Sequence, residues 1–411
     1  MGGLGDASIV IIGGGAIGTA SALALATAGV RDILLLEREP ALASVTTAQA
    51  AGLVGQVRST VERVRLAMAS VRTFSRLQRE GEVTPGWRQV GSLRVATTKE
   101  REEEFRGLAR VAAEAGLEVE TIEAREAERR WPGLTLERAT SVLWCPSDGY
   151  LQPYDLTMAY QHEARARGVR FATGVEVRDI RLDRGRVAGV ATDAGDIRCE
   201  MVINAAGAHA HHVARMVGLE LPIVPVRHEY FITVPVDGIR PDLPTFRFPD
   251  QTLYGRPDVN ALLLGGWEPA ALSLDPRDYG DAEPPAIAED WPVLSNFAEL
   301  LRPYYPRVAD AGIRRVLSGW PTFTPDGRFI VGESGAVKGF VLAAGCNAHG
   351  VSGSAGIGAH LVEAMLEPAP SPYVRSLSPD RFADGAWDWT SARRSAQSVY
   401  ETYYDLASVR R

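Results

Sequence analysis

The sequence predicts an α/β protein, α+β overall, with two different kinds of domain. A short β-branched strand, a glycine-rich turn and a helix follow one another at the start of the chain, and strands and helices alternate again towards its end. Between these regions the pattern is rich in strands. Alternating strands and helices form largely parallel sheets, and runs of strands form antiparallel ones. We therefore expect a nucleotide-binding domain assembled from separate segments, with an antiparallel-sheet domain inserted into it.

The first elements are typical of a Rossmann-like βαβ unit. The apolar run 8–12 predicts a buried strand, and residues 13–18 form a glycine-rich turn. The alanine-rich stretch 19–28 predicts a helix that Gly29 ends. A second buried strand is expected over 32–36.

The remaining elements divide the chain into two domains and a tail. Helices are expected over 61–79, within 99–130, and over 153–168, 293–301 and 355–366, and strands over 90–96, 175–182, 186–192, 195–203, 229–234 and 261–266. We expect a discontinuous nucleotide-binding domain (1–85, 140–222 and 306–370), a substrate domain (86–139 and 223–305) and a C-terminal tail (371–411).

Composition excludes several classes of function. The formal net charge is −7 and no basic block is present, so nucleic acid is not an expected partner. No apolar run is long enough for a membrane span, and the N-terminus lacks a signal pattern, which predicts a cytoplasmic protein. The three cysteines stand far apart, and His209, His211 and His212 have no acidic residue among them, so no metal site is expected.

A G-x-G-x-x-G motif predicts a dinucleotide site. Gly13, Gly15 and Gly18 follow a strand and open a helix, whose N-terminal amides bind a pyrophosphate. Glu37 follows Gly18 by 19 residues, at the end of the second strand, where an acid binds a ribose hydroxyl and disfavours a 2′-phosphate. The contacts expected from this unit are Gly13, Gly15, Ala16, Ile17, Gly18, Glu37 and Arg38.

Two further segments favour FAD over NAD. Residues 202–208 form a strand that ends in small residues, which lets a second strand end approach a bound dinucleotide. Residues 345–358 lead into a helix with a glycine-rich start, whose free amides and positive dipole end would stabilise a reduced flavin. Simple NAD-dependent dehydrogenases rarely need these additions.

These three elements, in this order, resemble the D-amino-acid-oxidase-like family of FAD-dependent oxidoreductases, which includes sarcosine oxidase, glycine oxidase and dimethylglycine dehydrogenase. The similarity covers most of residues 7–368, and the stretches 46–53, 224–230 and 324–332 also match. The expected fold is therefore a Rossmann-like FAD-binding domain with an inserted antiparallel-sheet substrate domain. The pattern is specific for the family and much less so for the substrate.

The resemblance implies further contacts to FAD and a noncovalent cofactor. Gln49 stands where the dimethylglycine dehydrogenase pattern has a flavin-linking histidine, and Gly319 falls about where monomeric sarcosine oxidase has a flavin-linking cysteine. Neither residue can form such a bond. The implied contacts are Thr46, Thr47, Gln49, Ala51, Gly52, Leu53, Val175, Ala206, Gly207, Gly319, His349, Gly350, Val351 and Ser352.

The resemblance also places aromatic side chains on the substrate side. Tyr254, Trp267 and Trp320 fall on segments that line this side, and with Phe323 they would form a wall over an amine. His228 lies on the expected active-site strand. The expected catalytic residues are His228, Tyr254, Arg256, Trp267 and Trp320.

The residue that binds a substrate carboxylate stays open. Arg256 offers bidentate binding, and Arg58 competes for that role. Pro321 falls near a carboxylate-binding arginine of glycine oxidase, and Leu263 falls where sarcosine oxidase has a lysine that speeds reaction with oxygen. The resemblance therefore implies neither simple α-amino acid recognition nor fast use of oxygen, and the electron acceptor is O₂ or another compound.

The leading prediction is FAD-dependent oxidation of a C–N bond in a small secondary or tertiary amine or N-methyl amino acid. The resemblance implies that hydride passes to flavin N5 and that water hydrolyses the imine product. A site with little negative charge would favour the neutral amine that loses hydride. The alternatives are oxidation of a primary amino acid or biosynthetic imino acid, oxidation of a 2-hydroxy acid, and a flavin-binding accessory subunit without turnover.

Overall fold

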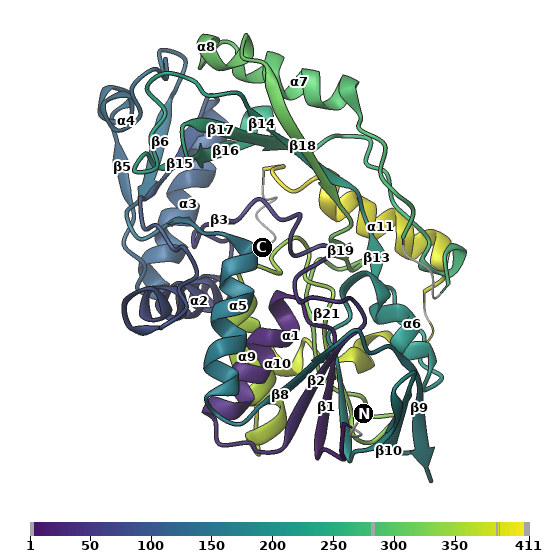
Figure 1. The fold of residues 1–411 in the computed structure, drawn as a ribbon. Coiled ribbons are helices and arrows are strands. Elements are labelled where there is room, and N and C mark those ends of the chain that lie inside the picture. Colours follow the sequence, from purple (N-terminus) through teal and green to yellow (C-terminus); the bar gives the residue numbers. More distant parts are fainter. Residues whose placement is uncertain (1–3, 281–283, 384, 386, 407–411) are drawn as a thin grey trace.

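Two main sheets stand one above the other, and the first strands of the chain form the centre of the lower one (Figure 1). A computed structural model describes residues 4–280, 284–383, 385 and 387–406. In spatial order the lower sheet consists of β20 (Ile330–Glu333), β21 (Phe340–Ala344), β12 (Met201–Asn204), β1 (Ile9–Ile12), β2 (Ile33–Glu37) and β8 (Arg170–Thr173). Neighbouring strands are parallel except β20 and β21.

Alternating side chains of β1 bury both faces of the lower sheet. Ile9 and Ile11 pack with helices on one face, and Val10 and Ile12 pack with a three-stranded sheet on the other. Fully burying each such side chain contributes roughly 1.5–3 kcal/mol. The helices are α1 (Ala16–Thr27), α5 (Pro153–Arg165) and α9 (Ser354–Leu366), and the small sheet consists of β9 (Val177–Asp183), β10 (Arg186–Thr192) and β11 (Gly195–Arg198).

Small residues let α1 and α9 pack closely side by side. A Cβ atom on Gly358 of α9 would lie 3.0 Å from the carbonyl oxygen of Ala20 and 3.1 Å from Cβ of Ala24, both in α1. Each helix follows a parallel strand, β1 or β21, so both helices begin at the carboxyl edge of the lower sheet. This edge therefore holds two adjacent helix N-termini.

The upper sheet has eight strands. In spatial order they are β18 (Ile313–Gly319), β14 (His228–Thr233), β17 (Ala261–Gly266), β16 (Leu253–Asp258), β15 (Thr245–Phe248), β4 (Ser92–Ala96), β6 (Ser141–Cys145) and β5 (Glu120–Ile122). Neighbours are antiparallel, as the sequence predicts, except for the parallel pair β4 and β15. These two strands belong to distant segments, and pairing between distant segments leaves no hairpin signal in the sequence.

The upper sheet also extends past the expected limits of the substrate domain. β6 pairs with β4, and β18 pairs with β14, although both β6 and β18 lie in segments expected to bind the nucleotide. We therefore assign β6 and β18 to the substrate side, which moves the proposed boundaries past 139 and 305.

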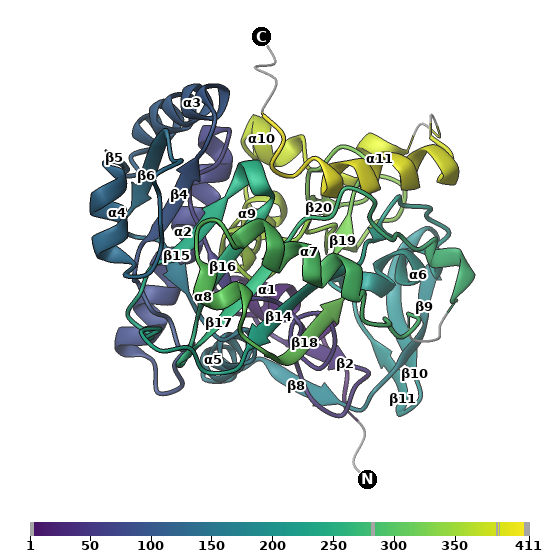
Figure 2. The ribbon, with the colours of Figure 1, turned by 90° about the horizontal axis from the view of Figure 1, so that it is seen from above.

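The two faces of the upper sheet pack against different elements. Seen from above, α7 (Trp291–Leu301) lies over β14, β16 and β17, and it buries Leu294 and Phe297 against them (Figure 2). The opposite, inner face carries Tyr254 and Leu263, which pack with α11 (Trp389–Glu401). This inner face is the one that borders the substrate cavity described below.

The segment expected as a C-terminal tail folds back onto the body of the protein. It contains α10 (Pro372–Arg375), a 3₁₀ turn (Pro379–Phe382) and α11. Asp388 caps α11 and forms a capping box with Ser391. The helix packs against β13 (Val224–Pro225) and β19 (Thr322–Phe323), and Tyr400 in its last turn is fully buried.

The other elements connect these layers. The charged segment expected to be mostly helix over 99–130 forms two helices, with β5 between them. The remaining helices and strands are α2 (Val61–Glu80), α3 (Lys99–Ala115), α4 (Ala124–Arg130), α6 (Ala210–Arg215), α8 (Pro306–Ala309), β3 (Leu53–Val54) and β7 (Gly149–Tyr150).

His211 in α6 predicts an acid-sensitive fold. Its ring is fully buried, and burial lowers its pKa from 6.5 to about 4. Between these pH values the unfolded chain binds a proton that the folded chain does not, so stability falls as the pH falls. Protonation of this histidine in the unfolded chain should lower the free energy of unfolding by about 2 kcal/mol between pH 7 and pH 5. Thermal unfolding at both pH values should show a smaller loss for His211→Asn, and an equal loss in both proteins would contradict the assignment.

Candidate functional site

The turn between β1 and α1 brings backbone against backbone. Gly13 has a φ of 111°, and a Cβ atom there would lie 2.5 Å from the carbonyl oxygen of Ala205, directly after β12. A Cβ atom on Gly18 would lie 1.9 Å from the carbonyl oxygen of Gly13. Side chains at these positions would force the turn, α1 and β12 apart. Without them, the first amides of α1 lie at the sheet edge, as pyrophosphate binding requires.

Glu37 is fixed at the end of β2 by two backbone amides. Its Oε2 accepts a hydrogen bond from the Gly14 amide at 2.6 Å, and its Oε1 accepts one from the Glu39 amide at 2.8 Å. Burial raises the pKa of this carboxyl, and the two amides act in the opposite direction. A carboxylate oxygen accepts more than one hydrogen bond, so Glu37 keeps acceptor capacity for a ribose hydroxyl.

A cavity of about 450 Å³ lies at this edge and is lined by nine of the residues predicted to bind the cofactor. Thr47 approaches the N-terminus of α1, where its hydroxyl accepts a hydrogen bond from the Ala16 amide at 3.1 Å. The predicted residues that line this cavity are Gly13, Gly15, Glu37, Arg38, Thr46, Thr47, Val175, Ala206 and Gly207. Gly18 does not line it, because its role is the close packing against Gly13.

A second cavity, of about 200 Å³, shares lining residues with the first and is also bordered by the inner face of the upper sheet. The shared residues include Gly15, Thr46, Thr47 and Gly207. The other predicted cofactor residues that line it are Ala16, Ile17, Gln49, Ala51, Gly52, Leu53, Gly319, His349, Gly350, Val351 and Ser352. From the upper sheet come His228, Tyr254 and Trp267. The structure therefore brings the expected flavin and substrate residues to one place.

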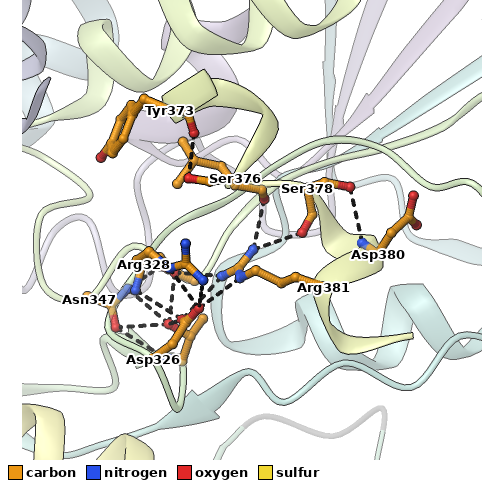
Figure 3. A network of polar contacts seen from close by, with 11 residues as sticks. Asp326, Arg328, Asn347, Tyr373, Ser376, Ser378, Asp380 and Arg381 are labelled. Atoms are coloured by element: carbon orange, nitrogen blue, oxygen red, sulfur yellow. Dashed lines mark hydrogen bonds and ion pairs between the residues drawn. The ribbon is translucent and has the colours of Figure 1, made fainter. Parts of the chain in front are cut away.

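The loop before α9 is held in a left-handed conformation by side chains around it (Figure 3). Gly345, Asn347 and Ala348 have positive φ values of 62°, 45° and 60°. The Asn347 side chain accepts a hydrogen bond from the Thr324 amide at 3.0 Å and donates one to the Gly345 carbonyl at 2.7 Å. The neighbouring turn is fixed in the same way, because Arg381 forms an ion pair with Asp326 at 2.8 Å. The C-terminal segment thus supports the loop that is predicted to face the flavin.

Gln49 and Gly319 lie beside each other in the second cavity. A Cβ atom on Gly319 would lie 2.6 Å from Oε1 of Gln49. His349 is the histidine on the flavin-facing loop, and both of its ring nitrogens are engaged, with the Asn347 carbonyl at 2.7 Å and the Tyr403 hydroxyl at 3.1 Å. Burial lowers the pKa of His349 well below its usual value, and Arg58 adds to this effect. These residues fit a noncovalent cofactor.

His228 joins the two aromatic walls of the second cavity. Its Nε2 lies 2.6 Å from the Tyr254 hydroxyl, and its Nδ1 lies 3.0 Å from the hydroxyl of Tyr400 in α11. Tyr400 in turn donates to Glu268 at 2.8 Å, and Glu268 pairs with Arg227 at 3.0 Å. A chain of polar contacts therefore connects the cavity with a buried ion pair.

This chain of contacts fixes the protonation of His228. The single hydroxyl proton of Tyr400 points to Glu268, so Nδ1 of His228 must carry the proton that Tyr400 accepts. Nε2 is then unprotonated and accepts the proton of the Tyr254 hydroxyl. Burial lowers the pKa of His228 to about 4, so the ring is neutral at neutral pH. Tyr254, supported by a neutral histidine, is thereby placed to receive or release a proton in the cavity.

Two of the expected catalytic residues lie outside the walls of the second cavity. Arg256 donates from Nε to the Ala51 carbonyl at 2.6 Å and also binds Asp258 at 3.3 Å, so it holds the flavin-side loop instead of facing the cavity. Trp320 donates from Nε1 to the Pro285 carbonyl at 2.9 Å, which turns its ring away. Arg256 and Trp320 stand close in sequence to the cavity residues Tyr254 and Gly319. Their own hydrogen bonds nevertheless direct their side chains elsewhere.

Other residues lining the second cavity did not follow from the sequence. Arg247 lies between two phenylalanines in β15, and this alternation was the signal that its side chain leaves the apolar face. Tyr403 and Tyr404 come from the end of the C-terminal segment. Tyr403 stacks on Trp267 with a centroid distance of 3.8 Å. Tyr400, Tyr403 and Tyr404 have the spacing of residues on one face of a helix. This spacing is the sequence pattern that could have predicted that they lie together.

The fold and the cavities agree with a comparison to known families. The profile of the FAD dependent oxidoreductase family (DAO) matches residues 8–364. The chain belongs to this family. The prediction of FAD as cofactor is confirmed. The glycine turn, the carboxylate at the end of β2 and the N-terminus of α9 stay the predicted contacts to it.

Relatives of this FAD-dependent oxidoreductase include enzymes that act on methylated amines. It is 32% identical to 4-methylaminobutanoate oxidase (formaldehyde-forming) from Paenarthrobacter nicotinovorans, over 91% of this chain and 45% of the relative. It is 31% identical to mitochondrial sarcosine dehydrogenase from Homo sapiens, over 97% of this chain and 44% of the relative. The chain thus spans about half the length of these relatives. The crystal structure of L-proline dehydrogenase from P. horikoshii has the same fold, with a TM-score of 0.83, 22% identity, and coverage of 93% and 100% of the two chains.

Membrane spans and metal sites can be sought in the described residues. Within those ranges, none of the helices combines the length and apolar character needed to cross a bilayer. The same part of the chain contains no group of three or more histidine, cysteine, aspartate or glutamate residues arranged to hold a metal ion.

Replacing Gly18 should abolish retention of FAD. The Cβ atom of Gly18→Ala would meet the Gly13 carbonyl and displace the turn that carries the pyrophosphate. We expect the purified variant to contain less than about a tenth of the FAD of the wild type, as measured by absorbance after denaturation.

The matched control is Gly107→Ala in α3, where a Cβ atom meets only Arg110, at 4.0 Å. Alanine is favoured over glycine in a helix by about 1 kcal/mol, so this variant should retain FAD and stability. Full FAD content in Gly18→Ala would show that the close approach of the turn is not required.

Proposed function

We propose that this chain oxidises a C–N bond of a small N-methyl amine or N-methyl amino acid, giving an imine that water hydrolyses. The observation that carries this proposal is the charge of the second cavity. Among the described residues that line it, none is an aspartate or glutamate, whereas Arg58 and Arg247 are both present. The positive charge of an alkylammonium ion is not stabilised by such surroundings. The cavity therefore favours binding of a neutral amine that also carries a carboxylate.

Tyr254 and His228 hold the substrate as the neutral amine. An alkylamine is mostly protonated at pH 7, since its pKa lies near that of lysine, about 10.4. The ammonium proton is lost to water as the substrate enters, because burial holds the pKa of His228 at about 4 and the ring cannot keep that proton. The Tyr254 hydroxyl donates to Nε2 of His228, 2.6 Å away, and presents its oxygen to the amine in the cavity. FAD, when bound, accepts the hydride that the neutral amine loses from the carbon beside nitrogen. Trp267 and Tyr403 exclude water from the remaining wall.

Arg58 and Arg247 orient the substrate by its carboxylate. Both line the second cavity, and neither has a carboxylate partner among the described residues. Arg256, the other candidate from the sequence, is occupied by the Ala51 carbonyl and by Asp258. An arginine without a partner is the better candidate for bidentate binding of a ligand carboxylate.

The relatives support the same reaction class, as the names of two of them refer to N-methyl compounds. Because the chain covers less than half of those proteins, their full activities do not transfer to it directly. The electron acceptor, O₂ or another compound, and the cytoplasmic location remain predictions. Oxidation of a primary amino acid, an imino acid or a 2-hydroxy acid, and the role of an accessory subunit, are the alternatives that the first experiment separates.

Anaerobic reduction of the bound flavin tests the proposal. N-methylglycine, dimethylglycine and 4-(methylamino)butanoate should bleach the flavin, and hydrolysis of the imine should release an aldehyde together with the dealkylated amine. Absorbance follows the flavin, and product analysis identifies the aldehyde and the amine. Readmitted air should restore the colour quickly for an oxidase and slowly for a dehydrogenase. Bleaching only by primary amino acids or by hydroxy acids would overturn the proposal in favour of that alternative, and no bleaching would favour the accessory subunit.

Tyr254→Phe should lower the limiting rate of flavin reduction at least about tenfold, because the neutral amine loses the hydroxyl oxygen that orients it. The apparent Kd for a substrate carboxylate should change little. Stopped-flow absorbance under anaerobic conditions gives both values. Tyr230→Phe removes a hydroxyl from β14 outside the cavity lining and serves as the control. A Tyr254→Phe rate equal to that of the control would exclude this role of Tyr254.

A further inference from the structure

Three arginines near the second cavity lack anionic partners. Arg58, Arg94 and Arg247 form no ion pair within the described residues, although only 9% of Arg247 is exposed and the other two are half-buried. The fully buried arginines of the same region behave differently. Arg101 pairs with Asp250 at 2.9 Å, and Arg227 pairs with Glu268 at 3.0 Å. The fold therefore compensates buried guanidinium groups elsewhere, but not in this cluster.

The three guanidinium groups are also brought close to one another. Arg94 and Arg247 are directly opposite residues of the parallel pair β4 and β15, so both side chains leave the same face of the sheet. Arg58 and Arg94 both donate to the carbonyl oxygen of Val57, at 2.9 and 3.5 Å. Arg247 reaches the same stretch of chain, since a Cβ atom on Gly55 would lie 2.8 Å from its Nη2.

This arrangement is unfavourable in the absence of an anion. Like charges directly opposite each other on a sheet destabilise it. Burial lowers the pKa of Arg58 to about 10, and Arg247 and Arg94 add to the shift. Burial and Arg247 lower the pKa of Arg94 in the same way. Clusters of uncompensated charge in a cleft are characteristic of binding sites.

The cluster extends from the second cavity into a third cavity of about 470 Å³. Arg247 lines only the second cavity and Arg94 only the third, while Arg58 lines both. The two cavities also share His349, Tyr403 and Tyr404. The arginines thus form a row that leads away from the flavin side.

Within the described part of the chain, the acidic residues of the third cavity form no ion pair with this row, although the charge of Glu104 raises the pKa of Arg94 and so offsets part of the burial. They are Glu104, Asp326 and Asp405. Glu104 pairs with Arg101 at 2.6 Å, and Asp326 pairs with Arg381 at 2.8 Å. Asp405 is exposed to solvent, where its charge is screened by water and salt.

We infer that the substrate carries two carboxylates, one bound by Arg247 and Arg58 beside the flavin and the second bound by Arg58 and Arg94 in the third cavity. The inference rests on the proposed function for the identity of the ligand as an amine substrate. A single carboxylate would leave the row with a net charge of two, whereas a dicarboxylate lowers that charge to one. The substrate class is thus an N-alkylated amino dicarboxylic acid.

Binding of dicarboxylates that cannot be oxidised tests the site independently of turnover. Glutarate and pentanoate have the same chain length and differ in the second carboxylate. Titrations of the holoprotein, followed by the flavin absorbance spectrum, should give a Kd at least about tenfold lower for glutarate. Arg94→Gln should remove this advantage and leave pentanoate within about twofold of its wild-type value. Arg65→Gln, exposed on α2, is the control and should preserve the preference.

Folding of the variant is checked by its FAD content and melting temperature, which should be unchanged or higher because a like-charge neighbour is removed. If Arg94→Gln does not fold, Arg94→Lys tests the same point, because it keeps the charge but loses bidentate binding and should weaken glutarate selectively. Equal affinities of glutarate and pentanoate in the wild type, or equal weakening of both by the variant, would overturn the inference.

Anaerobic reduction separates this inference from the proposed function. N-methylglutamate should reduce the flavin at concentrations at least about tenfold lower than N-methylglycine does. If N-methylglycine reduces the flavin and N-methylglutamate shows no advantage, the second carboxylate site is refuted and the proposed function stands. If neither compound reduces it but glutarate binding still depends on Arg94, the dianion site stands and the proposed amine oxidation fails.

Discussion

Backbone contact at the carboxyl edge of the lower sheet is the constraint on which the rest of the molecule depends. The Gly13–Gly18 turn touches the end of β12, and this contact sets how closely α1 approaches the sheet. α9 then packs on α1 through Gly358, which brings a second helix N-terminus to the same edge. Both FAD-binding elements are therefore positioned by the absence of side chains, and no polar contact could replace that geometry.

The substrate side is organised around a different principle, a line of buried polar groups. His228 is held between tyrosines of the upper sheet and of α11, and the line ends at Glu268 and Arg227. Such a network fixes one tautomer of the histidine and leaves its Nε2 as an acceptor. Arginines without an ion-pair partner among the described residues line the same cavity, so the site combines a neutral base with a positive electrostatic potential.

The parts of this arrangement that depend on local sequence could be predicted. The G-x-G-x-x-G turn, Glu37 at the end of β2 and the glycine-rich start of α9 each carry their signal within a few residues, and the FAD site and the fold class followed from them. Arg247 could not be assigned in the same way, because its position depends on register with β4, a strand from a distant segment. Arg256 shows the converse, since its neighbour Tyr254 faces the cavity while Arg256 binds Ala51 and Asp258.

The strand order of the lower sheet also bears on how the chain is made. β1 lies between two strands of the lower sheet. One is β2, which is close to it in sequence, and the other is β12, whose Met201 pairs with Ile9 of β1. During synthesis the glycine turn therefore leaves the ribosome long before the end of β12, which this turn must contact, has been made. Pairing of such distant segments is slow, and the unpaired edge is exposed meanwhile. FAD can consequently be taken up only after β12 has joined the sheet and α9 has packed on α1.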